Sequence, residues 1–191
     1  MKCLKLIFCL LYFCCSLAEA KEVQVDAQKE VDEMTGRLVA SYLEAKVDED
    51  IIAGYASALR SDGSFPDLDY VTVHEGSSYP AGSHLKRLKL MAIAYRKPGN
   101  KYYNSGRLLK QIVAGIDYWY RVRPKSGNWW FGDIGAPQDY MVPLILLKGK
   151  ISDKKLLHYS SYLQDLTGNK GHKGKNRTWV SAAVSYTHLR A

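Results

Sequence analysis

The order of apolar and polar residues predicts a chain of helices joined by short turns. Apolar side chains recur every three or four positions in several separate windows, with Lys, Arg, Glu and Asp between them, which is the period of an amphipathic helix. These windows cover residues 21–46, 48–59, 83–97, 104–123, 137–148 and 152–163. No segment of any length alternates with the two-residue period of a strand. The pattern therefore predicts an all-α protein.

Residues at the window boundaries indicate where the helices begin and end. Short polar side chains that suit an N-cap stand at the start of four of the windows, and a proline suits the first turn of another. These residues are Asp48, Ser83, Asn104 or Ser105, Ser152 or Asp153, and Pro137. Residues 61–67 are dense in turn formers and predict a loop, and residues 68–73 suit a short extended piece. We expect about six helices, paired as hairpins, in a solenoid or a closed α/α toroid. A sequence repeat of fixed period is not found, which disfavours the standard repeat families.

The first twenty residues differ from the rest. A positive start is followed by an apolar run over residues 6–17, and Ala18-Glu19-Ala20 supplies the small residues that a signal peptidase reads. We predict a signal peptide over residues 1–20, cleaved after Ala20, and a secreted or periplasmic protein without a membrane span. All four cysteines lie inside this segment, so the predicted mature chain has no thiol chemistry.

The net positive charge of the chain favours negatively charged binding partners. Lys and Arg number 27 against 19 Asp and Glu, a net charge of +8 that removal of residues 1–20 leaves strongly positive. A basic chain attracts polyanions, and an exported one meets acidic polysaccharides. Since no nucleic-acid-binding motif is present, we expect no nucleic-acid partner.

The candidate binding chemistry is concentrated in residues 127–138. This stretch places the tandem pair Trp129 and Trp130 beside Asn128, in what we predict to be a Gly-bounded loop. Two adjacent rings on an extended loop point in different directions, so one of them is expected to face solvent, where it would form a platform for a sugar ring. The alternative is that both rings fill a core. Basic residues precede the pair directly, namely Arg121, Arg123 and Lys125.

The sequence gives weaker indications of a metal site, a cofactor site or a hydrolytic active site. His74, His84, His158 and His172 are scattered without metal-ligand spacing, and we interpret His84 and His158 as structural. No phosphate loop, dinucleotide fingerprint or nucleophile elbow is present, so no cofactor is predicted. Asp62, Asp67 and Asp69 suggest a carboxylate pair for glycoside hydrolysis, although acids in such a loop are more often turn formers.

Several motifs together resemble polysaccharide lyase family 8, which includes chondroitin AC, hyaluronate and xanthan lyases. Asn128-Trp129-Trp130 with the segment 134–138 resembles the Asn-Trp-Trp…Glu-Ile-Gly-x-Pro motif of that family. The similarity continues in four further places over residues 35–183: Asp62-Gly63-Ser64-Phe65, His84-Leu85, Tyr118-Trp119 and Gly174-Lys175-Asn176-Arg177-Thr178. The chain departs from the family pattern at Asp133, where the usual residue is Glu, and at Lys175, where a small residue is usual.

The resemblance implies an α/α toroid whose cleft binds a uronic-acid polymer. It implies that Asn128, Trp129 and Trp130 bind the glycan, and Gln138 and Arg123 are assigned to the same group. Asn176 would be catalytic, since an Asn there helps to neutralise the uronate carboxylate and so acidifies the C5 proton. A Tyr and a His then transfer protons, and the C4–O bond breaks by β-elimination. In the family these two residues follow the Asn segment.

The chain ends before residues of that kind are expected. Residues 184–191 resemble the translation of a transposon-end sequencing adapter, so Tyr186 and His188 are not assigned as the catalytic pair. We expect residues 21–183 to be the N-terminal part of the toroid, an incomplete α/α toroid that is inactive and monomeric on its own. Two alternatives stay open: a secreted glycan-binding helical module without chemistry, and a glycoside hydrolase that uses Asp62 or Asp69.

Overall fold

The structure, a computed structural model, describes residues 29–166 and 173–178, and its regular secondary structure within them is helical. The named elements are α2 (Glu49–Ala58), α3 (Gly82–Arg96), α4 (Gly106–Val122), the π-helix η1 (Phe131–Gly135), α5 (Ala136–Leu147) and α6 (Asp153–Leu166). Residues 29–43 and 174–178 are also helical, and no strand occurs in either described range. The all-α prediction is confirmed. The predicted signal peptide at 1–20 and the segment 184–191 lie outside the described residues.

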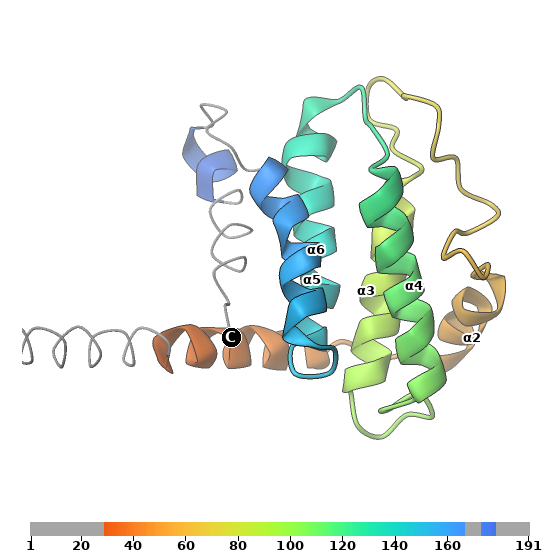
Figure 1. Cartoon of the computed structure of the whole chain (residues 1–191), viewed down its shortest axis with the longest axis vertical. Helices are drawn as coiled ribbons and strands as arrows, with labels where there is room; N and C mark the ends of the chain where they lie inside the picture. Colours follow the sequence, from red (N-terminus) through yellow and green to blue (C-terminus); the bar gives the residue numbers. More distant parts are fainter. Residues whose placement is uncertain (1–28, 167–172, 179–191) are drawn as a thin grey trace, which may run out of the picture. The chain divides into compact units, whose positions relative to one another are not determined.

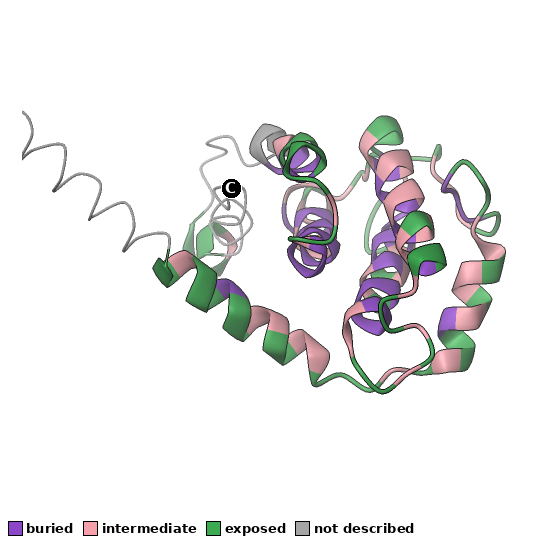
Figure 2. Cartoon of the chain, turned by 60° about the horizontal axis from the view of Figure 1, so that its bottom comes forward, coloured by how far each residue is buried: buried purple, intermediate pink, exposed green. Residues whose placement is uncertain are grey.

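The chain divides into two compact units, Met1–Ser41 and Tyr42–Ala191. In the second unit, α3 and α4 form one antiparallel hairpin and α5 and α6 form another, with α3 packed against α5 (Figure 1). Figure 2 shows that the buried positions of these helices face one another. Helix α5 is the central element, because every residue from Tyr140 to Leu147 is buried. Helix α3 also has a buried face, formed by Leu85, Leu88, Met91, Ala92 and Tyr95.

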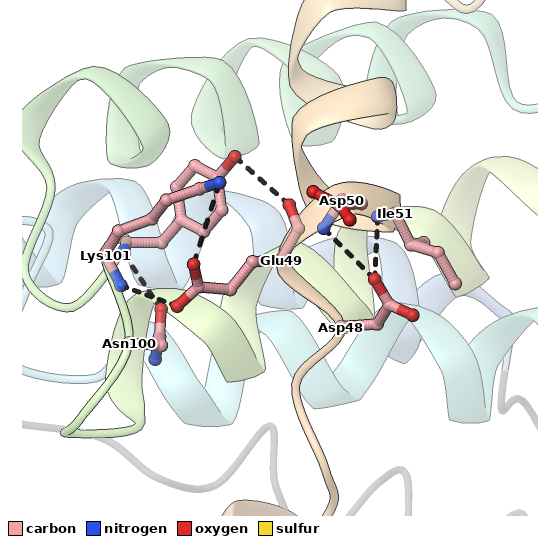
Figure 3. A network of polar contacts seen from close by, with 7 residues as sticks. Asp48, Glu49, Asp50, Ile51, Asn100 and Lys101 are labelled. Atoms are coloured by element: carbon pink, nitrogen blue, oxygen red, sulfur yellow. Dashed lines mark hydrogen bonds and ion pairs between the residues drawn. The ribbon is translucent and has the colours of Figure 1, made fainter.

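Three predicted N-caps are confirmed. The Asp48 carboxylate accepts hydrogen bonds from the backbone N–H groups of Asp50 and Ile51, each at 3.1 Å, at the start of α2 (Figure 3). Ser105 caps α4 by accepting from Leu108 N, and Ser152 accepts from Lys155 N ahead of α6. These caps are predictable because the interaction is local, linking a side chain to a backbone N–H two or three residues away.

Two local predictions are wrong. Ser83 is not the cap of α3, which begins at Gly82 without a side-chain cap. A backbone turn replaces it, since the N–H groups of Gly82 and Ser83 donate to the carbonyls of Tyr79 and Pro80. Residues 68–73 are not extended either, because the Asp69 carboxylate accepts from two following N–H groups and folds the segment into bends.

The helix containing α5 begins earlier than predicted, at Trp129. Residues 129–130 are α-helical, and η1 then joins them to α5 without a break. The N–H of Ala136 donates to the carbonyl of Phe131, five residues back, so this turn holds one residue more than an α-helical turn. Pro137 is consequently the second residue of α5 in a continuing helix, and its missing N–H falls just after the wide turn.

The loop at residues 61–67 is confirmed and packs tightly on α4. Gly63 is buried with φ +90°, and a Cβ added to it would lie 2.0 Å from the carbonyl oxygen of Ala114. The loop also places the Phe65 ring in the core with no exposed surface. Among the described helices, none combines the length and the apolar character that crossing a membrane requires.

Candidate functional site

The Trp-Trp pair lies at the start of a helix and not on an extended loop, which corrects the sequence prediction. Asn128 is the residue that starts it. Its Oδ1 accepts from the N–H of Trp130 at 2.9 Å, and its carbonyl accepts from Phe131 N at 3.2 Å. Its Nδ2 donates to the carbonyl of Gly76 at 2.7 Å. Because a carbonyl oxygen can only accept, the two ends of the amide are assigned without ambiguity.

Residues 74–79, which lie outside all the predicted helices, hold this helix start in place. Gly127 N donates to His74 O at 3.1 Å, and the Tyr79 hydroxyl donates to Pro124 O at 2.9 Å. The Glu75 carboxylate lies over Gly127, where an added Cβ would come within 2.8 Å of it. We call residues 74–79 the supporting segment. No periodic signal could have revealed it, since its contacts join loops that are distant in sequence.

The two tryptophans differ in exposure. Trp129 is 54% exposed, which confirms that one ring of the pair faces solvent. Trp130 is half-buried, with its ring over Gly135 and edge-on to Phe131 at a centroid distance of 5.5 Å. Trp129 therefore presents an apolar surface beside polar backbone, and Trp130 belongs to the packing beneath it.

The other predicted site residues lie in different surroundings. Gln138 is half-buried in the first turn of α5, on the same helix as the tryptophans. Arg123 ends α4 with φ +47°, and its guanidinium lies 4.9 Å and 5.2 Å from the ring centroids of Tyr120 and Tyr162. Asn176 is half-buried in the helical residues 174–178, beyond the undescribed residues 167–172. The structure thus brings Asn128, Trp129 and Trp130 together at one helix start and gives Arg123 aromatic packing partners.

Asp62 and Asp69 act as turn formers, and Asp67 pairs with Arg87. Asp62 accepts from the backbone and the hydroxyl of Ser64, and these two hydrogen bonds lower the pKa of its carboxyl. Hydrogen bonds from Thr72 and Val71 lower the pKa of Asp69, and hydrogen bonding to Arg87 does so for Asp67. A general acid needs a raised pKa, so this geometry gives no support to glycoside hydrolysis by these residues.

His84 is a buried structural residue, in agreement with its interpretation from sequence. Its Nε2 is 2.9 Å from Gly115 O, so Nε2 carries the proton and donates. Nδ1 then accepts from the Tyr70 hydroxyl at 2.9 Å, and that hydroxyl in turn accepts from Phe65 N. Burial lowers the pKa of His84 to about 4. His158 is exposed, with its ring 4.3 Å from that of Tyr120. Nowhere in residues 29–166 or 173–178 do three His, Cys, Asp or Glu side chains gather as metal ligands.

Replacing Asn128 with alanine should lower the free energy of unfolding by about 1–2 kcal/mol, because both the helix cap and the tie to Gly76 are lost. Asn128→Asp keeps the acceptor for Trp130 N and places a carboxylate at a helix N-terminus, so its loss should be smaller. Urea denaturation of the full chain followed by circular dichroism compares the two variants. A loss in Asn128→Asp as large as that in Asn128→Ala would contradict this expectation.

The family model and the relatives that match this chain are all polysaccharide lyases. Residues 28–187 match the family model described as polysaccharide lyase family 8, N-terminal alpha-helical domain. Chondroitinase-AC of Pedobacter heparinus is 30% identical over 135 residues, which cover 70% of this chain and 19% of that enzyme. Hyaluronate lyase HylB of Enterococcus faecalis is 30% identical over 112 residues, covering 52% and 11%. The chain thus spans less than a fifth of either relative.

Solved structures agree with the fold. A chondroitinase AC lyase structure, from a study of enzyme–oligosaccharide complexes, superposes with a TM-score of 0.73 at 26% identity, covering 83% of this chain and 24% of that one. A Paenibacillus xanthan lyase structure has a TM-score of 0.66 at 18% identity, covering 84% and 17%, and supports the fold alone. With these likenesses, the predicted all-α fold class is confirmed.

Proposed function

Because the chain belongs to polysaccharide lyase family 8, we propose that it is the N-terminal helical part of a secreted lyase that cleaves uronic-acid glycans by β-elimination. The names of its relatives support this substrate class, since they act on chondroitin, hyaluronan and xanthan. The observation that carries the proposal is the exposed Trp129 ring on a helix start fixed by Asn128 and the supporting segment. Because the backbone at this helix start is fixed, a pyranose face would bind the exposed ring with little further loss of backbone freedom.

The residues divide into two roles in this proposal. Trp129 contacts the sugar, and Gln138 and Arg123 supply polar contacts to the same glycan. Asn128 and Trp130 act from beneath by fixing the helix start, since both ends of the Asn128 amide already bind backbone groups. Asn176 would neutralise the uronate carboxylate, so that charge developing after loss of the C5 proton is stabilised. The His and Tyr that transfer protons are not assigned to residues of this chain, so we propose that it binds glycan without cleaving it.

Glycan binding by the full chain tests the proposal, with chondroitin and hyaluronan oligosaccharides as ligands in calorimetry. Trp129→Ala should weaken binding about 30-fold, as expected for an aromatic anchor worth about 2 kcal/mol. Tyr103→Ala removes an aromatic ring that is 46% exposed in the turn between α3 and α4, and should leave affinity unchanged. Ultraviolet absorbance should detect no unsaturated uronate product. If the Trp129 variant and the native chain bind the glycan with equal affinity, Trp129 is not a platform for a sugar ring. If product forms, the proposal that the chain binds glycan without cleaving it is wrong.

A further inference from the structure

A group of side chains outside the Trp-Trp pair gathers where the loop at residues 61–67 meets α4. Gly63 packs on the carbonyl of Ala114, an approach that is possible because glycine has no Cβ. Tyr118 and Arg121 follow Ala114 by one and two helical turns, so they lie on the face of α4 that the loop contacts. Arg60 is at the base of the loop, where Gly63 N donates to its carbonyl and its own N–H donates to Ser64 O. The fold therefore brings Arg60, Tyr118 and Arg121 around Asp62.

This group is held in a defined geometry. The Tyr118 ring stacks on the buried His84 ring at 5.9 Å and meets the Tyr70 ring edge-on at 4.9 Å. The Arg121 guanidinium lies over Tyr118, 5.5 Å from the ring centroid. Such a cation–π contact restrains the arginine without using any of its N–H donors. Arg121 therefore keeps its hydrogen-bonding capacity for another group.

The group carries more positive than negative charge, with two arginines and one aspartate. Arg60 and Arg121 are both exposed, and both help to lower the pKa of the Asp62 carboxyl, after the Ser64 hydrogen bonds that are the main cause. Yet neither guanidinium forms an ion pair with any residue of the described part of the chain. Some other cations of the unit do form ion pairs, such as Arg87 with Asp67, Lys101 with Glu49, and Lys155 with Asp117. The Asp62 carboxylate thus feels the charge of two guanidiniums without pairing with either, and its Oδ1 already accepts from Ser64.

We propose that Arg60 and Arg121 form an anion-binding subsite that holds a carboxylate or sulfate oxyanion of the glycan. Guanidinium groups match the planar, multidentate geometry of such oxyanions. Arg121 is in the last turn of α4, and the chain runs from there directly to the start of the Trp129 helix, at the same end of the helical array (Figure 1). One glycan chain contacts Trp129 through a sugar ring and this subsite through a charged substituent. The inference rests on the proposed function, because it assigns the glycan as the source of the anion.

Substitution of the two arginines tests the subsite. In calorimetry with the full chain, Arg60→Gln and Arg121→Gln should each weaken binding of a hyaluronan or chondroitin sulfate oligosaccharide about 3- to 10-fold, and the double variant more. The double variant should also show a weaker dependence of affinity on salt. Arg107→Gln is the matched control, since it removes an exposed arginine from the same helix about 21 Å away. Its affinity should equal that of the native chain.

The two glycans distinguish the source of the oxyanion. Hyaluronan carries only carboxylates, so weakening on both glycans identifies a uronate, and weakening on chondroitin sulfate alone identifies a sulfate ester. A double variant that behaves like Arg107→Gln, while Trp129→Ala still loses affinity, would overturn the subsite and leave the proposed function intact. If the native chain binds neither glycan, the proposed function fails, and titration with inorganic sulfate then tests the subsite alone. Shifts of the Arg60 and Arg121 Nε–H resonances in NMR spectra would support it, and unchanged resonances would overturn it.

Discussion

Adding a single methyl group at Gly63 is expected to lower the free energy of unfolding by about 3 kcal/mol or more. Two costs combine. The residue has φ +90°, a conformation that costs an L-residue roughly 1–3 kcal/mol. The new Cβ would also lie 2.0 Å from the carbonyl oxygen of Ala114 and 2.5 Å from its carbon. These are backbone atoms of α4 and cannot rotate away, so the loop must move and the buried Phe65 ring must move with it.

Gly99→Ala separates these two costs. Gly99 has φ +82°, close to that of Gly63, but no heavy atom lies within 4 Å of its ideal Cβ. Its substitution should therefore cost only the backbone strain, about 1 kcal/mol. Urea denaturation of both variants in the full chain gives the difference, which measures the close approach of the loop to α4. If the two variants lose the same stability, the packing of the loop on α4 does not contribute to folding.

The elements that were predicted well from the sequence are those whose structure depends on residues close together in the chain. Helix α4 shows this most clearly, because its apolar residues Leu108, Ile112, Ile116 and Trp119 follow the helical period and are all buried. Ser105 acts on an N–H only three residues away, so its role can be read from the chain alone. The exposure of one ring of the Trp-Trp pair was also predictable, because adjacent side chains diverge.

The features that could not be predicted from the sequence depend on contacts between residues that are distant in the chain. Pro137 suited a helix start, but the wide turn of η1 lets the helix continue back to Trp129, and Asn128 caps it there. The tie from Asn128 to Gly76 spans two loops and leaves no periodic signal. Arg123 lies close to the Trp-Trp pair in sequence, yet its guanidinium packs on Tyr120 and also on Tyr162 of α6, a contact with a distant residue. Proximity in sequence was therefore a weaker guide to the site than the fold that joins these segments.

Acid should destabilise the fold through His84, by about 2 kcal/mol between pH 7.5 and pH 5. The folded pKa is about 4 because burial disfavours the charged ring, whereas the unfolded pKa is 6.5. Between these values the unfolded chain binds more protons, so stability is fully present above pH 6.5 and is lost as the pH falls toward 4, where the loss reaches about 3 kcal/mol. Protonation would also give Nδ1 a hydrogen where it now accepts from the Tyr70 hydroxyl.

The measurement is the free energy of unfolding in urea for the full chain at several pH values from 7.5 to 5. His84→Gln should flatten this dependence even if it lowers stability throughout, because an amide does not titrate in the range. His158→Gln removes an exposed histidine and should leave most of the dependence in place. If His84→Gln does not fold, NMR titration of the His84 ring in the native chain decides the question directly. A folded-state pKa near 6.5 would contradict the prediction, since a ring that charges as easily in the fold as in the unfolded chain adds no pH dependence to stability.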